Sequence, residues 1–120
     1  MFELSQTFYF EAAHTLQRQH EAEGSRRVHG HTYHAEVQIA GECDAASGMV
    51  MDLAVLRAAI ARVRDQLDHH LLDDVAGLGP ATLENLCVFI HREVVSTVPS
   101  VSMVSVSRAS GDRCVYRPAA

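Results

Sequence analysis

The segment His31-Thr32-Tyr33-His34-Ala35-Glu36-Val37-Gln38-Ile39 decides the fold, because its side chains alternate between two chemical types. Odd positions from 33 to 39 are tyrosine, alanine, valine and isoleucine, whereas the even positions are all polar. Such alternation predicts a β-strand with one buried face. Residues 2–10 repeat the pattern with phenylalanine and leucine at alternate positions, interrupted by Gln6, and predict a second strand.

Two helical stripes follow these strands. Apolar residues recur every three or four positions from Leu53 to Leu67, directly after Asp52, which can cap a helix N-terminus. A second stripe runs from Leu83 to Val94, follows Thr82 and stops before Pro99. The connection over residues 71–80 contains two glycines and a proline, which separate the helices.

The C-terminal part predicts two more strands. Residues 104–107 alternate again, Ser110-Gly111-Asp112 predicts a turn, and Cys114-Val115-Tyr116 begins a last strand. The order is therefore ββααββ, which predicts an α+β domain over residues 1–120. It would have a four-stranded antiparallel sheet with two helices on one face. Because so small a sheet leaves its edges unpaired, we also expect a homo-oligomer.

Composition limits the function classes. The 120 residues carry a net charge of −5, which argues against a general binder of nucleic acid or of anionic membranes. No apolar run approaches the length of a membrane span, and the first residues lack the pattern of a signal peptide. Three widely spaced cysteines predict reduced thiols and a cytoplasmic protein.

Three histidines form the first candidate site. His29 and His31 would share one face of an extended segment, and His14 ends the segment Phe10-Glu11-Ala12-Ala13-His14. Three neutral imidazoles suit a catalytic zinc ion, which keeps a fourth position for water or substrate. The alternative is that the His-Gly-His pair is ordinary surface polarity.

Two further groups admit two interpretations each. Asp68 beside His69 could orient an imidazole for proton transfer, or the pair could simply follow a helix C-terminus, where the macrodipole favours a cation. Glu84 lies in the first turn of the second helix, where a carboxylate is commonplace. It could also accept two hydrogen bonds from an amidine-like edge of a heterocycle.

Six segments in this order resemble the family of 6-pyruvoyl-tetrahydropterin synthase and 6-carboxytetrahydropterin synthase. The chain looks most like the bacterial enzymes of the queuosine pathway. The matching segments are Phe10–His14, His29–His31, Gly48–Asp52, Leu67–His70, Pro80–Asn85 and Cys114–Tyr116.

The resemblance implies a T-fold, in which subunits join their sheets into a barrel, usually as a hexamer of two trimers. It implies zinc on His14, His29 and His31, and a pterin ring anchored by Glu84. It also implies a relay of Asp68 and His69 that reaches across a subunit interface. The implied reaction is a lyase reaction on the small-molecule pterin 7,8-dihydroneopterin triphosphate, with release of acetaldehyde and triphosphate.

The chain departs from the family at two positions. The family's catalytic cysteine corresponds to Ser25, whose hydroxyl is a much poorer proton acceptor than a thiol. A family glutamate corresponds to Arg108, which could contact phosphate or pair with a carboxylate. Glu23 is the nearest carboxylate that could replace the cysteine. The leading hypothesis is a zinc-dependent lyase of the 6-carboxytetrahydropterin synthase type, with either the standard or an altered product. The alternative is a pterin- or purine-binding protein without the standard catalysis.

Overall fold

Four antiparallel strands form one sheet in the order β1-β2-β3-β4. In the computed structural model, which describes residues 1–119, they are β1 (Phe2–His14), β2 (His29–Gly41), β3 (Val101–Arg108) and β4 (Arg113–Tyr116). Each strand pairs with the next one along the chain, and the two long helices are inserted between β2 and β3. The predicted order ββααββ is confirmed.

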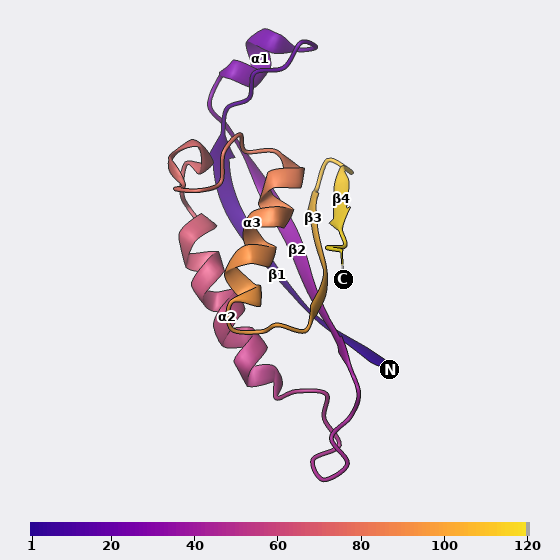
Figure 1. Ribbon diagram of the computed structural model, residues 1–120. Coiled ribbons are helices and arrows are strands. Elements are labelled where there is room, and N and C mark those ends of the chain that lie inside the picture. Colours follow the sequence, from indigo (N-terminus) through magenta and orange to yellow (C-terminus); the bar gives the residue numbers. More distant parts are fainter. Residues whose placement is uncertain (120) are drawn as a thin grey trace.

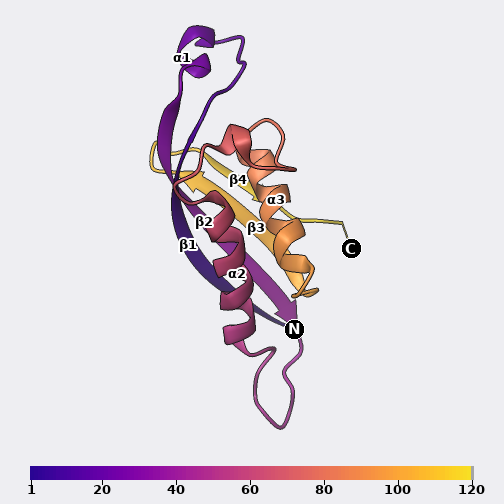
Figure 2. The ribbon, with the colours of Figure 1, turned by 90° about the vertical axis from the view of Figure 1, so that its left-hand side faces the viewer.

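The helices α2 (Leu53–Leu67) and α3 (Leu83–Val95) lie on one face of the sheet (Figures 1 and 2). Both begin at the predicted caps. The carboxylate of Asp52 accepts a hydrogen bond from the Ala54 N–H at 2.9 Å, and the Thr82 hydroxyl accepts one from the Asn85 N–H at 3.1 Å. Each cap satisfies one backbone donor that the helix itself leaves free.

The core lies between the helices and the inner face of the sheet. Residues 33, 35, 37 and 39 of β2 are buried, as their alternation predicts. Phe10 of β1 stacks on Tyr33 with ring centroids 5.0 Å apart, and neither side chain is exposed. Leu56 and Val63 of α2 complete this packing from the helical side.

The structure adds features that the sequence patterns did not predict. Strands β1 and β2 are 13 residues long and extend through His14 and back to His29, beyond the predicted residues 2–10 and 31–39. A short helix α1 (Ala22–Arg26) stands at the end of this long hairpin (Figure 1), and a 3₁₀ helix η1 (Leu72–Asp74) precedes α3. No helix within residues 1–119 is long and apolar enough to cross a membrane.

Candidate active site

The pairing of β1 with β2 brings the three histidines together. His14 lies opposite His29, and His31 lies two residues further along the same strand, opposite Ala12. Because strand side chains repeat with period two, all three rings project from the same face. Their potential ligand nitrogens lie within 4.8 Å of one another, and His14 is only 1% exposed. The three rings therefore converge, as the metal hypothesis requires.

Backbone carbonyls orient two of the rings. The Nδ1–H of His14 donates to the carbonyl of Ala81 at 2.9 Å, and the Nδ1–H of His29 donates to that of Arg27 at 2.8 Å. This tautomer leaves Nε2 free to bind a metal, as is common for metal-ligating histidines. The Nε2 atoms of His14 and His31 are 3.1 Å apart. Two tetrahedral zinc ligands lie about 3.3 Å apart, so the donor set fits zinc.

The surroundings of His14 and His31 favour the neutral form of these two rings. Burial, helped by the nearby positive charge of Arg108, lowers the pKa of His31 to about 4. Burial also lowers the pKa of His14, although its hydrogen bond to Ala81 opposes this shift. Because a metal binds only the neutral imidazole, neither ring has to lose a proton at pH 7.

A cavity of about 500 Å³ adjoins the triad. Its lining includes Ser25, His29, His31 and Arg108. Ser25 is buried, and its hydroxyl donates to the Ala22 carbonyl at 2.9 Å while accepting from the Arg18 N–H at 3.3 Å. The structure thus brings Ser25 to the cavity beside the three histidines, with its hydroxyl already engaged in holding the loop around α1.

A smaller cavity of about 230 Å³ shares Arg108 with the first one. Its lining also includes Tyr33, Thr82 and Glu84. Glu84 is placed there by the cap of α3, which starts the helix at the residue before it. Leu16, Arg18 and Arg108 line both cavities, so the space beside the histidines adjoins the space beside Glu84.

Asp68 and His69 lie elsewhere in the chain. The Asp68 carboxylate accepts from the Glu11 N–H and from Nδ1–H of His69, both at 2.9 Å, and Arg64 lies 3.4 Å away. The backbone bond to Glu11 and the bond to His69 hold the pKa of Asp68 below its usual range. Asp68 and His69 therefore form a hydrogen-bonded pair, and the ring of His69 is exposed.

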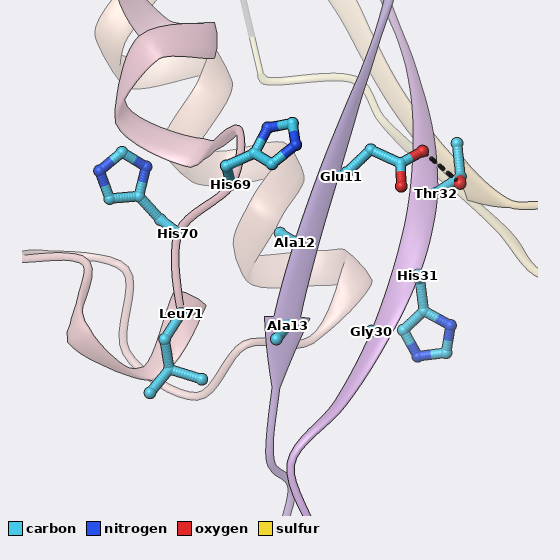
Figure 3. A pocket seen from close by; sticks show the side chains of 9 residues that line it. All are labelled: Glu11, Ala12, Ala13, Gly30, His31, Thr32, His69, His70 and Leu71. Carbon is cyan, nitrogen blue, oxygen red and sulfur yellow. Dashed lines mark hydrogen bonds between the residues drawn. The ribbon is translucent and has the colours of Figure 1, made fainter.

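This pair does not line the cavities that hold Ser25 and Glu84. His69 borders a separate cavity of about 480 Å³ together with Glu11, Thr32 and His31 (Figure 3). In Figure 3 the ribbons of β1 and β2 pass between the rings of His69 and His31, and Glu11 accepts a hydrogen bond from Thr32 at 2.6 Å. Within one chain, Asp68 and His69 therefore approach the three histidines from the other side of the hairpin.

Glu23 does not reach either cavity. Its carboxylate is 86% exposed and pairs with Arg27 at 2.9 Å. In contrast, Leu16, Arg18 and Tyr33 line the site, although the sequence patterns did not single them out. In the sequence, Tyr33 is one residue of the buried face predicted for residues 33–39. That alternation gives no information about its hydroxyl.

Comparisons with known proteins agree with this arrangement. A family model described as 6-pyruvoyl tetrahydropterin synthase matches residues 3–119. A 6-carboxy-5,6,7,8-tetrahydropterin synthase of Synechocystis is 36% identical over 88% of this chain and 85% of its own. One of Bacillus subtilis is 30% identical over 98% of this chain and 86% of its own. A dihydroneopterin monophosphate aldolase of Pyrococcus furiosus is 31% identical over 75% of this chain and 72% of its own.

Solved structures match over the whole chain. The 6-pyruvoyl tetrahydropterin synthase of Caenorhabditis elegans superposes with a TM-score of 0.87 and 25% identity, covering 98% of this chain and 96% of the other. The predicted T-fold, with its four-stranded antiparallel sheet and helices, is therefore confirmed. On the family match, the full-length relatives and the shared fold, the chain belongs to the 6-pyruvoyl tetrahydropterin synthase family of pterin-metabolising lyases.

Proposed function

We propose that this protein is a zinc-dependent lyase of the 6-carboxytetrahydropterin synthase type, acting on 7,8-dihydroneopterin triphosphate. The observation that carries the proposal is the pair of adjoining cavities with three converging histidines at one end and Glu84 at the other. A substituted pterin has two ends that suit this arrangement. Its side chain could bind a metal held by the histidines, and its ring could bind the carboxylate of Glu84. The full-length relatives named as 6-carboxytetrahydropterin synthases support the same assignment.

The residues would divide the work as follows. His14, His29 and His31 would hold zinc, which when bound would supply a Lewis acid that polarises oxygens of the substrate side chain. Glu84 would accept hydrogen bonds from the amino-pyrimidine edge of the ring. Asp68 and His69 would move protons at the side-chain carbons.

The relay supports an assembly with shared sites. Asp68 and His69 lie across the hairpin from the cavity of their own chain, which supports a role for this pair at the site of a neighbouring subunit. We therefore propose a homo-oligomer, a hexamer of two trimers, in which each site takes its relay from another subunit. A cytoplasmic location and a place in the queuosine or a related pterin pathway complete the proposal.

Ser25 favours a second candidate function. Its hydroxyl is committed to Ala22 and Arg18, and no thiol takes its place in the cavity within residues 1–119. A serine in this setting is a weak proton acceptor near neutral pH. The second candidate is therefore a pterin- or purine-binding protein of the same fold that does not catalyse the standard cleavage. The similarity to an aldolase supports an altered product as a third outcome.

Turnover of 7,8-dihydroneopterin triphosphate by zinc-loaded protein, with identification of the products, tests the proposal directly. Acetaldehyde and triphosphate are the expected products. Ser25→Cys should raise the rate if Ser25 merely replaces the thiol, because a cysteine near cationic groups ionises near neutral pH. Glu23→Gln serves as the matched variant, and from its exposed ion pair with Arg27 we expect an unchanged rate. If the wild type and both variants bind the pterin without converting it, the result supports the second candidate, a binding protein without the standard catalysis.

A further inference from the structure

Two buried polar groups near Glu84 lack hydrogen-bond partners. Within residues 1–119, the hydroxyl of Tyr33 and the Nε of Arg108 are the buried side-chain nitrogen and oxygen atoms without a partner. Leaving such a group unsatisfied costs roughly 1–3 kcal/mol, so a native protein needs a reason to retain one. Since both groups border the same cavity of about 230 Å³, a ligand that occupies this cavity would supply the missing partners.

Arg108 stands between the two ends of the site. It lines the cavity of the histidine triad as well as the one that contains Glu84. Its positive charge contributes to lowering the pKa of His14 and His31, and it also acts on the hydroxyl of Tyr33. A ligand that reaches from Glu84 to the histidines must therefore pass the guanidinium.

The guanidinium is held in place and presents free donors. Nη2 of Arg108 donates to Asp112 at 2.8 Å, and the side chain is 20% exposed. A guanidinium carries parallel N–H bonds in a fixed fork, and one Nη2–H remains available beside the free Nε–H. Such a fork matches two acceptors that lie side by side, as in the contact of arginine with the O6 and N7 atoms of guanine.

We infer that Arg108 is a specificity residue that reads the carbonyl oxygen and the adjacent ring nitrogen of a 2-amino-4-oxo fused pyrimidine, while Glu84 takes its neighbouring donor edge. In a pterin these acceptors are O4 and N5, and they lie between the donor edge and the C6 side chain. That order matches the order of Glu84, Arg108 and the histidines along the joined cavities. The inference rests on the proposed ring site at Glu84.

The charges argue against a free anion as the partner of Arg108. Asp112 already pairs with Arg108, and Glu21 pairs with Arg18 at 3.2 Å. With Glu84, three carboxylates face two guanidinium groups in the joined cavities, so the protein itself provides no excess of positive charge. A neutral acceptor pair uses the free N–H donors without adding a further negative charge.

Pterin and 5-deazapterin provide the test, because they differ only in the replacement of ring nitrogen N5 by C–H. Their affinities for the intact protein can be measured by calorimetry, with and without zinc. The wild type should bind pterin roughly tenfold to a hundredfold more tightly than 5-deazapterin. This ratio corresponds to the loss of one hydrogen bond to a charged donor. Arg108→Met should abolish this preference, and Arg108→Lys should restore it poorly, because lysine keeps the charge but not the fork.

Two variants serve as controls. Arg113→Met removes an exposed arginine of β4 that lines neither cavity, and it should keep the wild-type preference. Glu84→Gln should weaken both ligands by a similar factor, because the donor edge is the same in both. The inference would be overturned if the wild type bound pterin and 5-deazapterin equally well or bound neither. It would also be overturned if Arg108→Met kept the preference for pterin.

Parallel turnover measurements separate this inference from the proposed function. If the preference for pterin over 5-deazapterin depends on Arg108 but the protein has no lyase activity, the inference is supported and the lyase assignment is wrong. Turnover by a protein whose preference is independent of Arg108 removes the inference alone.

Discussion

His14 shows how one residue combines structural and chemical roles. It ends β1, is buried beneath the 80–85 segment and donates its Nδ1–H to the Ala81 carbonyl. A buried histidine without such a partner would be costly, so this bond offsets the burial of the ring, fixes its tautomer and presents Nε2 to its neighbours. His29 and His31 lie in more open surroundings, where the solvent and a ligand can approach.

Zinc binding is the first prediction at this scale. The protein should bind one zinc ion per chain, and His31→Ala should weaken binding at least about a hundredfold, since even loss of a supporting residue costs 10–100-fold. His34→Ala is the matched control, because His34 lies on the same strand but points to the outer, exposed face. Competition titration with a chromogenic chelator measures both. Equal affinities in the two variants would contradict the metal site.

The depressed histidine pKa values predict how metal-free protein responds to acid. The pKa of His31 is about 4 in the folded chain and near 6.5 when unfolded. Between these values the unfolded chain binds a proton that the folded chain refuses, so stability falls as the pH drops from 6.5 towards 4. Denaturant midpoints at pH 7.5 and pH 5 measure the loss.

His31→Gln should reduce that loss, because the titrating ring is gone. His34→Gln, which removes an exposed histidine of the same strand, should leave the loss as in the wild type. The same loss in both variants would show that His31 is not responsible.

At the scale of elements, caps and strand pairing position the site. The register of β1 and β2 sets the spacing of the triad, and the Thr82 cap sets where Glu84 enters the small cavity. The loop after α2 is fastened to β1, because Asp68 accepts from the Glu11 N–H and the His69 N–H donates to the Glu11 carbonyl. His69 has a φ of 59°, a left-handed conformation that is uncommon for residues other than glycine.

The cap of α2 gives the prediction at this scale. Asp52→Ala should lower the free energy of unfolding by about 1 kcal/mol, because the Ala54 N–H loses its acceptor. Zinc affinity should not change, since α2 begins far from the triad. Asp65→Ala, an exposed position within the same helix, should change stability by less than about 0.5 kcal/mol. Denaturant unfolding followed by circular dichroism compares the two variants.

The sequence predicted those elements that have a strong period or a cap. The alternation in residues 31–39 and the stripes after Asp52 and Thr82 each became the expected element. The extension of the hairpin to His14 and His29 was not predicted, because histidine, glycine and alanine carry no clear strand pattern. Helix α1 was missed because five polar and small residues form no apolar stripe.

The candidate site was predictable only where residue chemistry is specific. Three histidines suggest a metal from their type alone, whereas the closeness of Arg108 and Glu84 depends on how α3 packs against β3. The unpaired state of the Tyr33 hydroxyl depends on the packing around it, which no sequence pattern reveals.

At the scale of the molecule, the chain is an elongated body of 57 × 23 × 23 Å whose sheet ends in the edge strands β1 and β4. Residues 68–71 pair with β1 at Glu11 and Ala13, near one end of that edge. Unpaired backbone groups on such edges favour pairing with other subunits. Phe2 and Tyr9 on β1 are each 54% exposed, which adds apolar surface at that edge. These features fit the proposed assembly with shared sites.

Assembly gives the prediction at this scale. Light scattering at micromolar concentration should show a trimer-based oligomer, and a monomer would contradict it. Coexpression of His31→Ala with Asp68→Asn tests the shared sites, because a mixed oligomer can combine an intact triad from one subunit with an intact relay from another. Partial recovery of lyase activity is expected only in the mixture. An inactive mixture of correctly assembled protein would place the relay and the metal in the same subunit or remove the relay role.

The bond from His14 to the Ala81 carbonyl has a thermodynamic consequence for the whole site. Ala81 belongs to the turn that leads into α3 and to Glu84, so the proposed metal ligand His14 and the proposed ring anchor Glu84 are connected to one backbone segment. A metal that fixes the His14 ring also restrains this turn, and a heterocycle that fixes Glu84 restrains the same turn from its other end. Each ligand would therefore strengthen the binding of the other by an equal factor, as linkage requires. The effect of zinc on substrate affinity and the effect of substrate on zinc affinity would then measure the same coupling free energy.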